Sequence, residues 1–65
     1  MYKNKIRRYR ELRGMTLKEL ADKAGISAGY LSHLERGDRD NPSKEVMENI
    51  AGILRVQIGT LFFNE

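Results

Sequence analysis

The turn of residues 25–27 joins two short amphipathic stretches, and this spacing restricts the fold more than any other feature of the chain. Before the turn, apolar side chains recur at the spacing of one helical face, at Leu17, Leu20, Ala21 and Ala24. Gly25 can take the positive φ that ends a helix, and the Ser27 hydroxyl can cap the next one. Leu31 and Leu34 would anchor that second helix to a core and leave its other face exposed. The pattern predicts two helices joined by a tight turn, the form of a helix-turn-helix.

Similar start and stop signals divide the rest of the chain. Thr16 and Glu19 have the spacing of a capping box. An earlier helix is predicted from about residue 3 to 13, on the apolar spacing of Ile6, Tyr9 and Leu12, with Gly14 at its end. Ser43 is expected to cap a fourth helix, and a short last helix is expected from about residue 58 to 63. The apolar stripe of the fourth helix comprises Met47, Ile50, Ala51 and Leu54. No stretch alternates like a strand, so the chain is predicted to be all-α: one domain over residues 1–65, a compact bundle of about five short helices.

Composition excludes several classes of site. The chain has no cysteine and one histidine, which rules out a disulfide framework, a thiolate zinc site, a cysteine nucleophile and a multi-histidine metal site. No cofactor or metal is expected, and no small-molecule ligand is evident from the sequence. No apolar run approaches the ~20 residues of a membrane span, so no membrane partner is expected.

Positive charge gathers at the start of the chain. Residues 1–13 hold six basic side chains and one acidic side chain, whereas residues 14–65 hold six basic and eight acidic ones. A basic end on a small domain indicates a polyanion partner. On charge alone, an ordinary solvated helix face fits equally well.

Residues 17–36, LKELADKAGISAGYLSHLER, resemble the helix-turn-helix of the lambda-repressor-like, Cro-type regulators, also called the xenobiotic-response-element family. The resemblance extends to Ile6, Tyr9 and Arg10, to the run Glu35-Arg36-Gly37 with Asn41-Pro42-Ser43, and to the closing helices. It implies a lambda-repressor-like fold that binds double-stranded DNA. It further implies a bacterial or phage transcriptional repressor, in the cytoplasm with the nucleoid, that acts as a homodimer on a palindromic operator.

The resemblance also implies roles for individual residues. The helix at about residues 28–35 would read base edges in the major groove with Ala28, Gly29, Ser32 and His33. Ser27, Tyr30 and Arg36 would lie at or near the DNA backbone, and Arg10 with Glu35 would form a partly buried structural pair. Ala28 and Gly29 have no polar side chain, so they can offer at most a contact with a thymine methyl group or a close backbone approach.

Phosphate chemistry adds residues outside that helix. Exposed helix starts offer amides and positive charge, here at Thr16, Lys18, Ser43 and Lys44. Arg39 and Asn41, in the polar loop between the third and fourth helices, complete the predicted DNA-binding set. Arg36 has the chemistry to bind either guanine or phosphate, and its place near the helix end favours phosphate.

Apolar side chains crowd the C-terminal residues, at Ile58, Leu61, Phe62 and Phe63. A short helix buries only one face, so this set is predicted to form a dimer surface. In the alternative, both phenylalanines close the core. An alternative function is a protein-interaction module of antitoxin type that uses these phenylalanines against a partner chain.

Two residues of the third helix have other interpretations. Tyr30 has the alternative of covering the core edge. Ser32 beside His33 suggests a hydrolase only superficially, because neighbours on a helix point in different directions and no oxyanion loop is visible. No enzyme is expected.

Overall fold

Five α-helices and no strand make up the part of the chain that this computed structural model describes, residues 4–37 and 42–63. The helices are α1 (Ile6–Leu12), α2 (Leu17–Ala24), α3 (Ala28–Arg36), α4 (Lys44–Leu54) and α5 (Ile58–Phe62). The predicted all-α architecture is confirmed. The expected start of the first helix near residue 3 is wrong for residues 4 and 5, because the Asn4 side chain accepts a hydrogen bond from the Ile6 amide and α1 begins there.

Three helices begin with the caps that the sequence predicts. The Thr16 hydroxyl accepts from the Glu19 amide at 3.1 Å, and the Glu19 carboxylate accepts from the Thr16 amide at 2.8 Å. Ser27 caps α3 by accepting from the Tyr30 amide at 3.0 Å. Ser43 caps α4 in the same way, at 3.1 Å from the Val46 amide. Each cap satisfies a first-turn amide that has no partner within its own helix.

Left-handed residues follow four of the helices, and Gly14 after α1 has φ 71°, as expected. Gly25 ends α2 with φ 73°, as expected. Gly37 ends α3 in the same conformation. Arg55 ends α4 with φ 62°, a conformation that side chains with a Cβ rarely adopt. The sequence pattern does not predict a left-handed conformation at Arg55.

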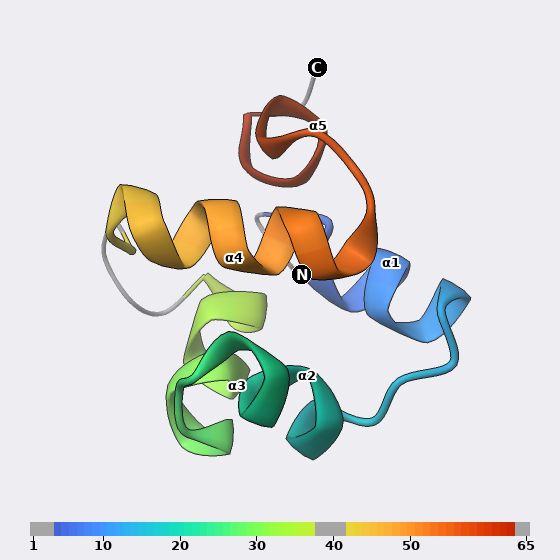
Figure 1. Cartoon of the computed structure of the whole chain (residues 1–65), viewed down its shortest axis with the longest axis vertical. Coiled ribbons are helices and arrows are strands. Elements are labelled where there is room, and N and C mark those ends of the chain that lie inside the picture. Colours follow the sequence, from blue (N-terminus) through green and yellow to red (C-terminus); the bar gives the residue numbers. More distant parts are fainter. Residues whose placement is uncertain (1–3, 38–41, 64–65) are drawn as a thin grey trace.

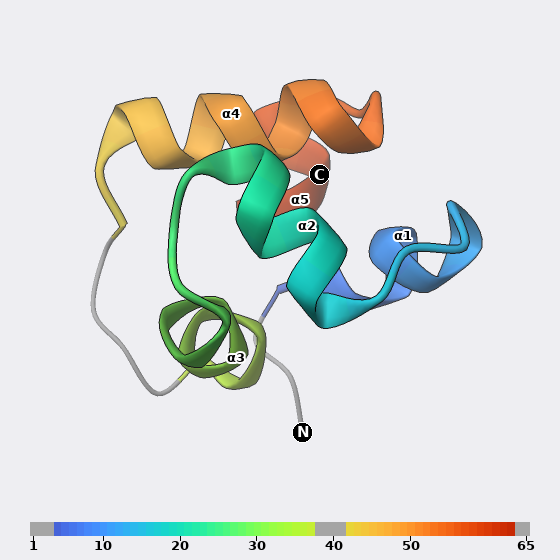
Figure 2. The ribbon, with the colours of Figure 1, turned by 60° about the horizontal axis from the view of Figure 1, so that its bottom comes forward.

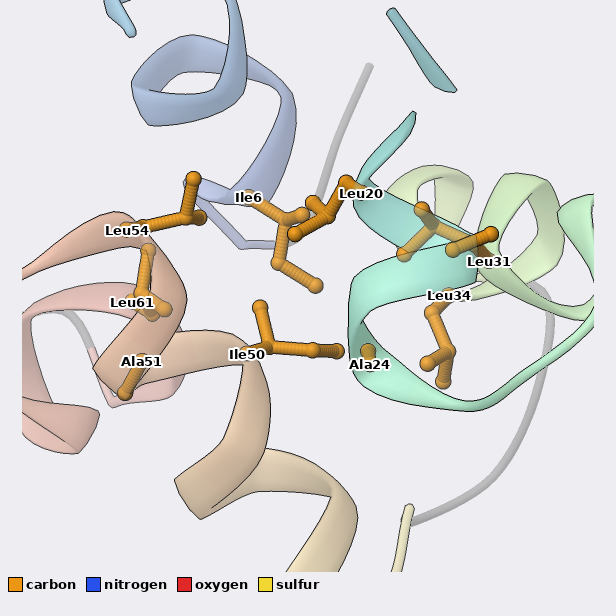
Figure 3. Packing of buried hydrophobic residues seen from close by; sticks show 10 residues of the cluster. Ile6, Leu20, Ala24, Leu31, Leu34, Ile50, Ala51, Leu54 and Leu61 are labelled. Carbon is orange, nitrogen blue, oxygen red and sulfur yellow. The ribbon is translucent and has the colours of Figure 1, made fainter. Parts of the chain in front are cut away.

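The core is one apolar cluster to which all five helices contribute. Figure 3 shows Ile6 and Ile50 in its middle, with Leu54 and Leu61 on one side and Leu31 and Leu34 on the other. Leu12 belongs to the apolar triplet whose spacing predicts the first helix, but it lies outside the core and is 65% exposed. Six residues after Ile6, an α-helix has turned so that Leu12 lies about 120° away from it.

α4 is the element around which the others are arranged. It packs against α1, α2 and α5, and α2 packs in turn against α3. α4 crosses the middle of the view in Figure 1, with α5 on one side of it and the α2–α3 pair on the other. α3 lies at the edge of the bundle (Figure 2), and its residues Gly29 and Arg36 are exposed.

Candidate nucleic-acid interface

The outer face of α3 carries a small cluster of polar side chains. Leu31, Leu34 and Glu35 bury the inner face of the helix. The Arg36 guanidinium reaches back one turn, with Nη1 donating to the Ser32 hydroxyl at 3.1 Å. Its Nη2 lies 3.2 Å from Nδ1 of His33. The structure thus brings together three of the residues that the sequence predicts for DNA contact.

These contacts define the hydrogen-bonding character of the cluster. A guanidinium has donors only, so the contact with His33 is a hydrogen bond when Nδ1 accepts and the neutral ring holds its proton on Nε2. The Ser32 oxygen also accepts, while its hydroxyl proton remains a donor. Guanine O6 and N7 and the phosphate oxygens are acceptors, and this donor-rich cluster complements them.

The first turn of α3 supplies little polar chemistry. Ala28 and Tyr30 are partly buried and pack against the core, which fits the alternative that Tyr30 covers the core edge. Gly29 is exposed, and open space surrounds the place where a Cβ would stand. At Gly29, therefore, another molecule can approach the backbone of α3 closely.

The starts of α2 and α4 are exposed at Thr16, Lys18, Ser43 and Lys44, as the sequence predicts. The Thr16 and Ser43 oxygens accept from their capped amides, so each hydroxyl has its proton left to donate. Lys18 pairs with Asp22 at 3.0 Å, an exposed contact that contributes little to stability. The predicted contacts at Arg39 and Asn41 lie outside the described residues.

A buried ion pair fixes α3 against α1. Arg10 Nε lies 2.6 Å from Glu35 Oε2, Arg10 Nη2 lies 3.2 Å from Oε1, and Nη1 donates to the Met15 carbonyl at 3.0 Å. The side chains of Arg10 and Glu35 are 12% and 5% exposed, which agrees with the expected structural pair. The hydrogen bond to Glu35 raises the pKa of Arg10 above its ordinary value, against the opposing effect of burial. Arg10 therefore stays charged at neutral pH. The stability that its pairing with Glu35 contributes is lost only when the pH rises through this raised pKa.

Residues at the C-terminus divide between core and surface. Phe63 is 60% exposed, while Ile58 and Phe62 are partly buried against the core. The assignment of Leu61 to a dimer surface is wrong, because its side chain is 1% exposed and belongs to the core. On a helix as short as α5, one apolar residue faces the bundle and its neighbours remain at the rim.

A hollow of about 780 Å³ lies away from the α3 cluster, lined by Arg13, Met15, Lys23, Gly52, Ile53 and Arg55. Its three cations stand at or near the C-terminal ends of α1, α2 and α4, where positive charge balances the helix dipoles. Arg13 also donates to the Leu54 carbonyl at 2.8 Å. The positions of these cations at helix ends agree with a structural role for the positive charge of this hollow.

Two long-range side-chain contacts were not predicted from the sequence. They are the Arg13 bond to α4 and the bond from Asn4 to the Leu34 carbonyl at 2.7 Å. Neither contact has a signal in the sequence, because the place of Asn4 two residues before Ile6 indicates only that its side chain can reach the Ile6 amide. Among the described residues, no group of three or more metal-ligating side chains comes together. In the same part of the chain, no helix has the length and apolar character to cross a membrane.

The arrangement matches a known family. A family model described as helix-turn-helix matches residues 6–61. The chain belongs to this helix-turn-helix family. The match covers the two helices of the predicted motif, α2 and α3, and the three helices that pack around them.

Curated relatives of this helix-turn-helix chain are regulators. The HTH-type transcriptional regulator SinR of Bacillus subtilis (strain 168) is 41% identical over 61 residues, which are 94% of this chain and 55% of that protein. The immunity repressor protein of Bacillus phage phi105 is 39% identical over 61 residues, 94% of this chain and 42% of that protein. The chain thus spans about half the length of the curated relatives it matches.

Solved structures show the same fold. The N-terminal DNA-binding domain of SinR from Bacillus subtilis aligns with a TM-score of 0.79 at 41% identity, over 86% of this chain and 81% of that one. A crystal structure of SinR in complex with DNA aligns with a TM-score of 0.80 at 41% identity, over 86% of this chain and 89% of that one.

Proposed function

We propose that this chain is the DNA-binding domain of a transcriptional regulator that represses by occupying a specific double-stranded operator. The observation that carries the proposal is the outer face of α3, where Ser32, His33 and Arg36 form a donor-rich cluster on a helix held by a buried ion pair. The names of SinR and of the phage immunity repressor, and the solved complex of SinR with DNA, support it. The proposed function calls for no catalytic step, cofactor or metal.

The proposed mechanism separates positioning from reading. A major groove about 12 Å wide admits a helix such as α3, whose Ser32 and His33 then face base edges. Gly29 lets the α3 backbone approach closely, and the methyl group of Ala28 is a partner for a thymine methyl. Arg36, Tyr30 and Ser27 lie at the ends and flanks of this face, beside the phosphates.

Phosphate contacts come from the starts of α2 and α4. Donors, charge and first-turn amides are presented to the DNA backbone by Thr16, Lys18, Ser43 and Lys44. Arg39 and Asn41, which precede α4 in the sequence, extend this proposed set. These groups fix the register of the domain on the duplex and carry no sequence information directly. The α3 cluster supplies the choice of sequence.

A second copy of the chain is the proposed partner on DNA. Few side chains on α3 can read bases, so one protomer discriminates poorly, and two-fold repetition doubles the set of contacts. Phe63, with Ile58 and Phe62 beside it, forms the proposed pairing surface at α5. The whole unit of residues 1–65 acts as a single domain, in the cytoplasm on the nucleoid.

Selection of bound sites from a random duplex library tests the function. We expect a two-fold symmetric site whose half-sites lie about one helical turn, ~34 Å, apart. Failure to enrich any site, together with no binding to random duplex at low salt, would reject the proposal. That result would favour the alternative, a protein-interaction module, for which the 60% exposure of Phe63 is the supporting observation.

A further inference from the structure

Two consecutive residues at the start of α1 hold α3 and α5 at the same time. The Asn4 side chain donates from Nδ2 to the Leu34 carbonyl, in the last turn of α3, at 2.7 Å. The Lys5 backbone amide donates to the Leu61 carbonyl in α5 at 2.9 Å. Because residues 4 and 5 are joined by one peptide bond, these contacts connect the end of α3 to α5 through a very short piece of chain.

The orientation of the Asn4 amide is fixed at both ends. Its Oδ1 accepts from the Ile6 amide at 3.1 Å, which leaves Nδ2 to meet Leu34. A side-chain amide is the group that accepts at one end and donates at the other. Ile6, Leu34 and Leu61 are 0%, 3% and 1% exposed, so all the backbone partners belong to core residues. Figure 3 shows Ile6 between Leu61 and Leu34.

Asn4 adds a second point of attachment for α3. The Arg10–Glu35 pair is one polar contact between α3 and the N-terminal segment, and it adds to the packing of Leu31 and Leu34 in the core. The Asn4 bond holds α3 at Leu34, the residue before Glu35. It comes from the residues that precede α1, whereas Arg10 lies within α1. Together the two contacts fix the direction of α3 relative to the rest of the bundle.

We propose that Asn4 is a positioning residue that sets the distance between half-sites by holding α3 in register with α5. This inference rests on the proposed function, in which α3 reads the DNA and α5 pairs two protomers. In a two-fold dimer, the separation of the two α3 helices depends on how α3 is placed relative to α5 in each copy. Symmetry doubles any change in that placement.

Asn4→Asp removes the bond to α3 and keeps the bond at which α1 begins. The aspartate still accepts from the Ile6 amide, and its charge is favourable at a helix N-terminus. It has no donor for the Leu34 carbonyl, so the link to α3 is lost. Arg13→Ala is the matched control: it also lowers the net charge from +3 to +2, and it removes a side-chain-to-carbonyl bond that joins α1 to α4. Neither α3 nor α5 takes part in that bond.

The experiment measures affinity on duplexes whose half-site spacing differs from the selected operator by one or two base pairs. We expect the affinity of the wild type to fall about tenfold or more with each change in spacing, because one half-site then turns away from the α3 helix that contacts it. Asn4→Asp should reduce that loss to about threefold or less. Arg13→Ala should bind all spacings more weakly and keep the wild-type optimum. Circular dichroism confirms that each variant is folded, and Asn4→Ser, which is neutral and too short to reach Leu34, carries the same expectation if Asn4→Asp unfolds.

A folded Asn4 variant with the wild-type spacing preference would overturn the positioning role while leaving the proposed function intact. A wild type that binds its site with no spacing preference would overturn both the two-site arrangement and this role. A wild type that binds no duplex would reject the proposed function itself.

Discussion

Glu35 in α3 receives two hydrogen bonds from Arg10 in α1, across 25 residues of sequence. Both side chains are largely shielded from water, so each neutralises a charge that the interior would otherwise hold alone. The pair joins the helix that carries the polar cluster to the first helix of the bundle. Its loss would affect both the fold and the candidate interface.

Removal of either partner is expected to destabilise the domain strongly. Arg10→Ala or Glu35→Ala leaves an uncompensated buried charge, at a cost of about 3–5 kcal/mol. A 65-residue domain has little stability in reserve, so either variant is expected to be largely unfolded at room temperature. Urea unfolding followed by circular dichroism measures the change.

The double variant Arg10→Met with Glu35→Leu is the control. Since it removes both charges and keeps apolar volume, it should recover much of the lost stability. Small and equal losses for the two single variants would contradict the account of a buried pair and show a contact of surface strength.

The sequence pattern predicts the local structure well because caps and stops act within a few residues. Thr16 with Glu19, Ser27 and Ser43 form the expected caps, and Gly25 takes the expected positive φ. These interactions depend on neighbours along the chain, so their signals are readable without knowledge of the fold.

The errors arise where packing between helices decides the outcome. Leu12 shares helical spacing with Ile6 and Tyr9 and yet is exposed, whereas the guanidinium groups of Arg10 and Arg13 reach into the bundle to Glu35 and the Leu54 carbonyl. Leu61 and Phe63 have similar hydrophobicity, yet the first is buried and the second exposed. The bond from Asn4 to Leu34 spans 30 residues and has no local signature.

Arg55 offers a route to higher stability. Its left-handed φ of 62° crowds the Cβ against the backbone, and such strain costs an ordinary residue about 1–2 kcal/mol. Arg55→Gly should raise the free energy of unfolding by about 0.5–1 kcal/mol, since glycine also loses more entropy on folding. Thermal and urea melts measure the gain. Arg55→Ala keeps the Cβ and should show no comparable gain; equal gains for both variants would point to the loss of charge instead.

The variant Gly29→Ala tests whether DNA approaches the α3 backbone closely. A Cβ at this position meets no atom within 4 Å, so Gly29→Ala should be accommodated and should stabilise the helix by about 0.5 kcal/mol. If DNA approaches this backbone closely, the same methyl group should weaken operator binding. Melting curves and equilibrium titration of the selected operator give the two values. A more stable variant with undiminished affinity would remove Gly29 from the interface.

Phe63 tests the pairing surface. Phe63→Ser changes a side chain that is 60% exposed, so the variant should fold like the wild type. We expect sedimentation to show weak pairing of the wild type that the operator strengthens, and weaker two-site binding by the variant. Leu12→Ser is the matched control, because Leu12 is a 65% exposed apolar residue outside the proposed surface. Wild-type operator affinity in Phe63→Ser would exclude this surface from pairing.

One titration series tests most directly whether α3 reads bases while the starts of α2 and α4 bind phosphates. Affinities of the wild type, Ser32→Ala and Lys44→Ala are measured for the selected operator and a scrambled duplex across a range of salt concentrations. For a bound dimer we expect log K to fall with log salt at a slope of about −5 to −9. Lys44→Ala should weaken both duplexes alike and make the slope shallower by about 1 per protomer. Ser32→Ala should lose affinity chiefly for the operator, by about 1–3 kcal/mol, and keep the wild-type slope. Tight binding with a slope near zero, or an operator preference unchanged by Ser32→Ala, would contradict this division.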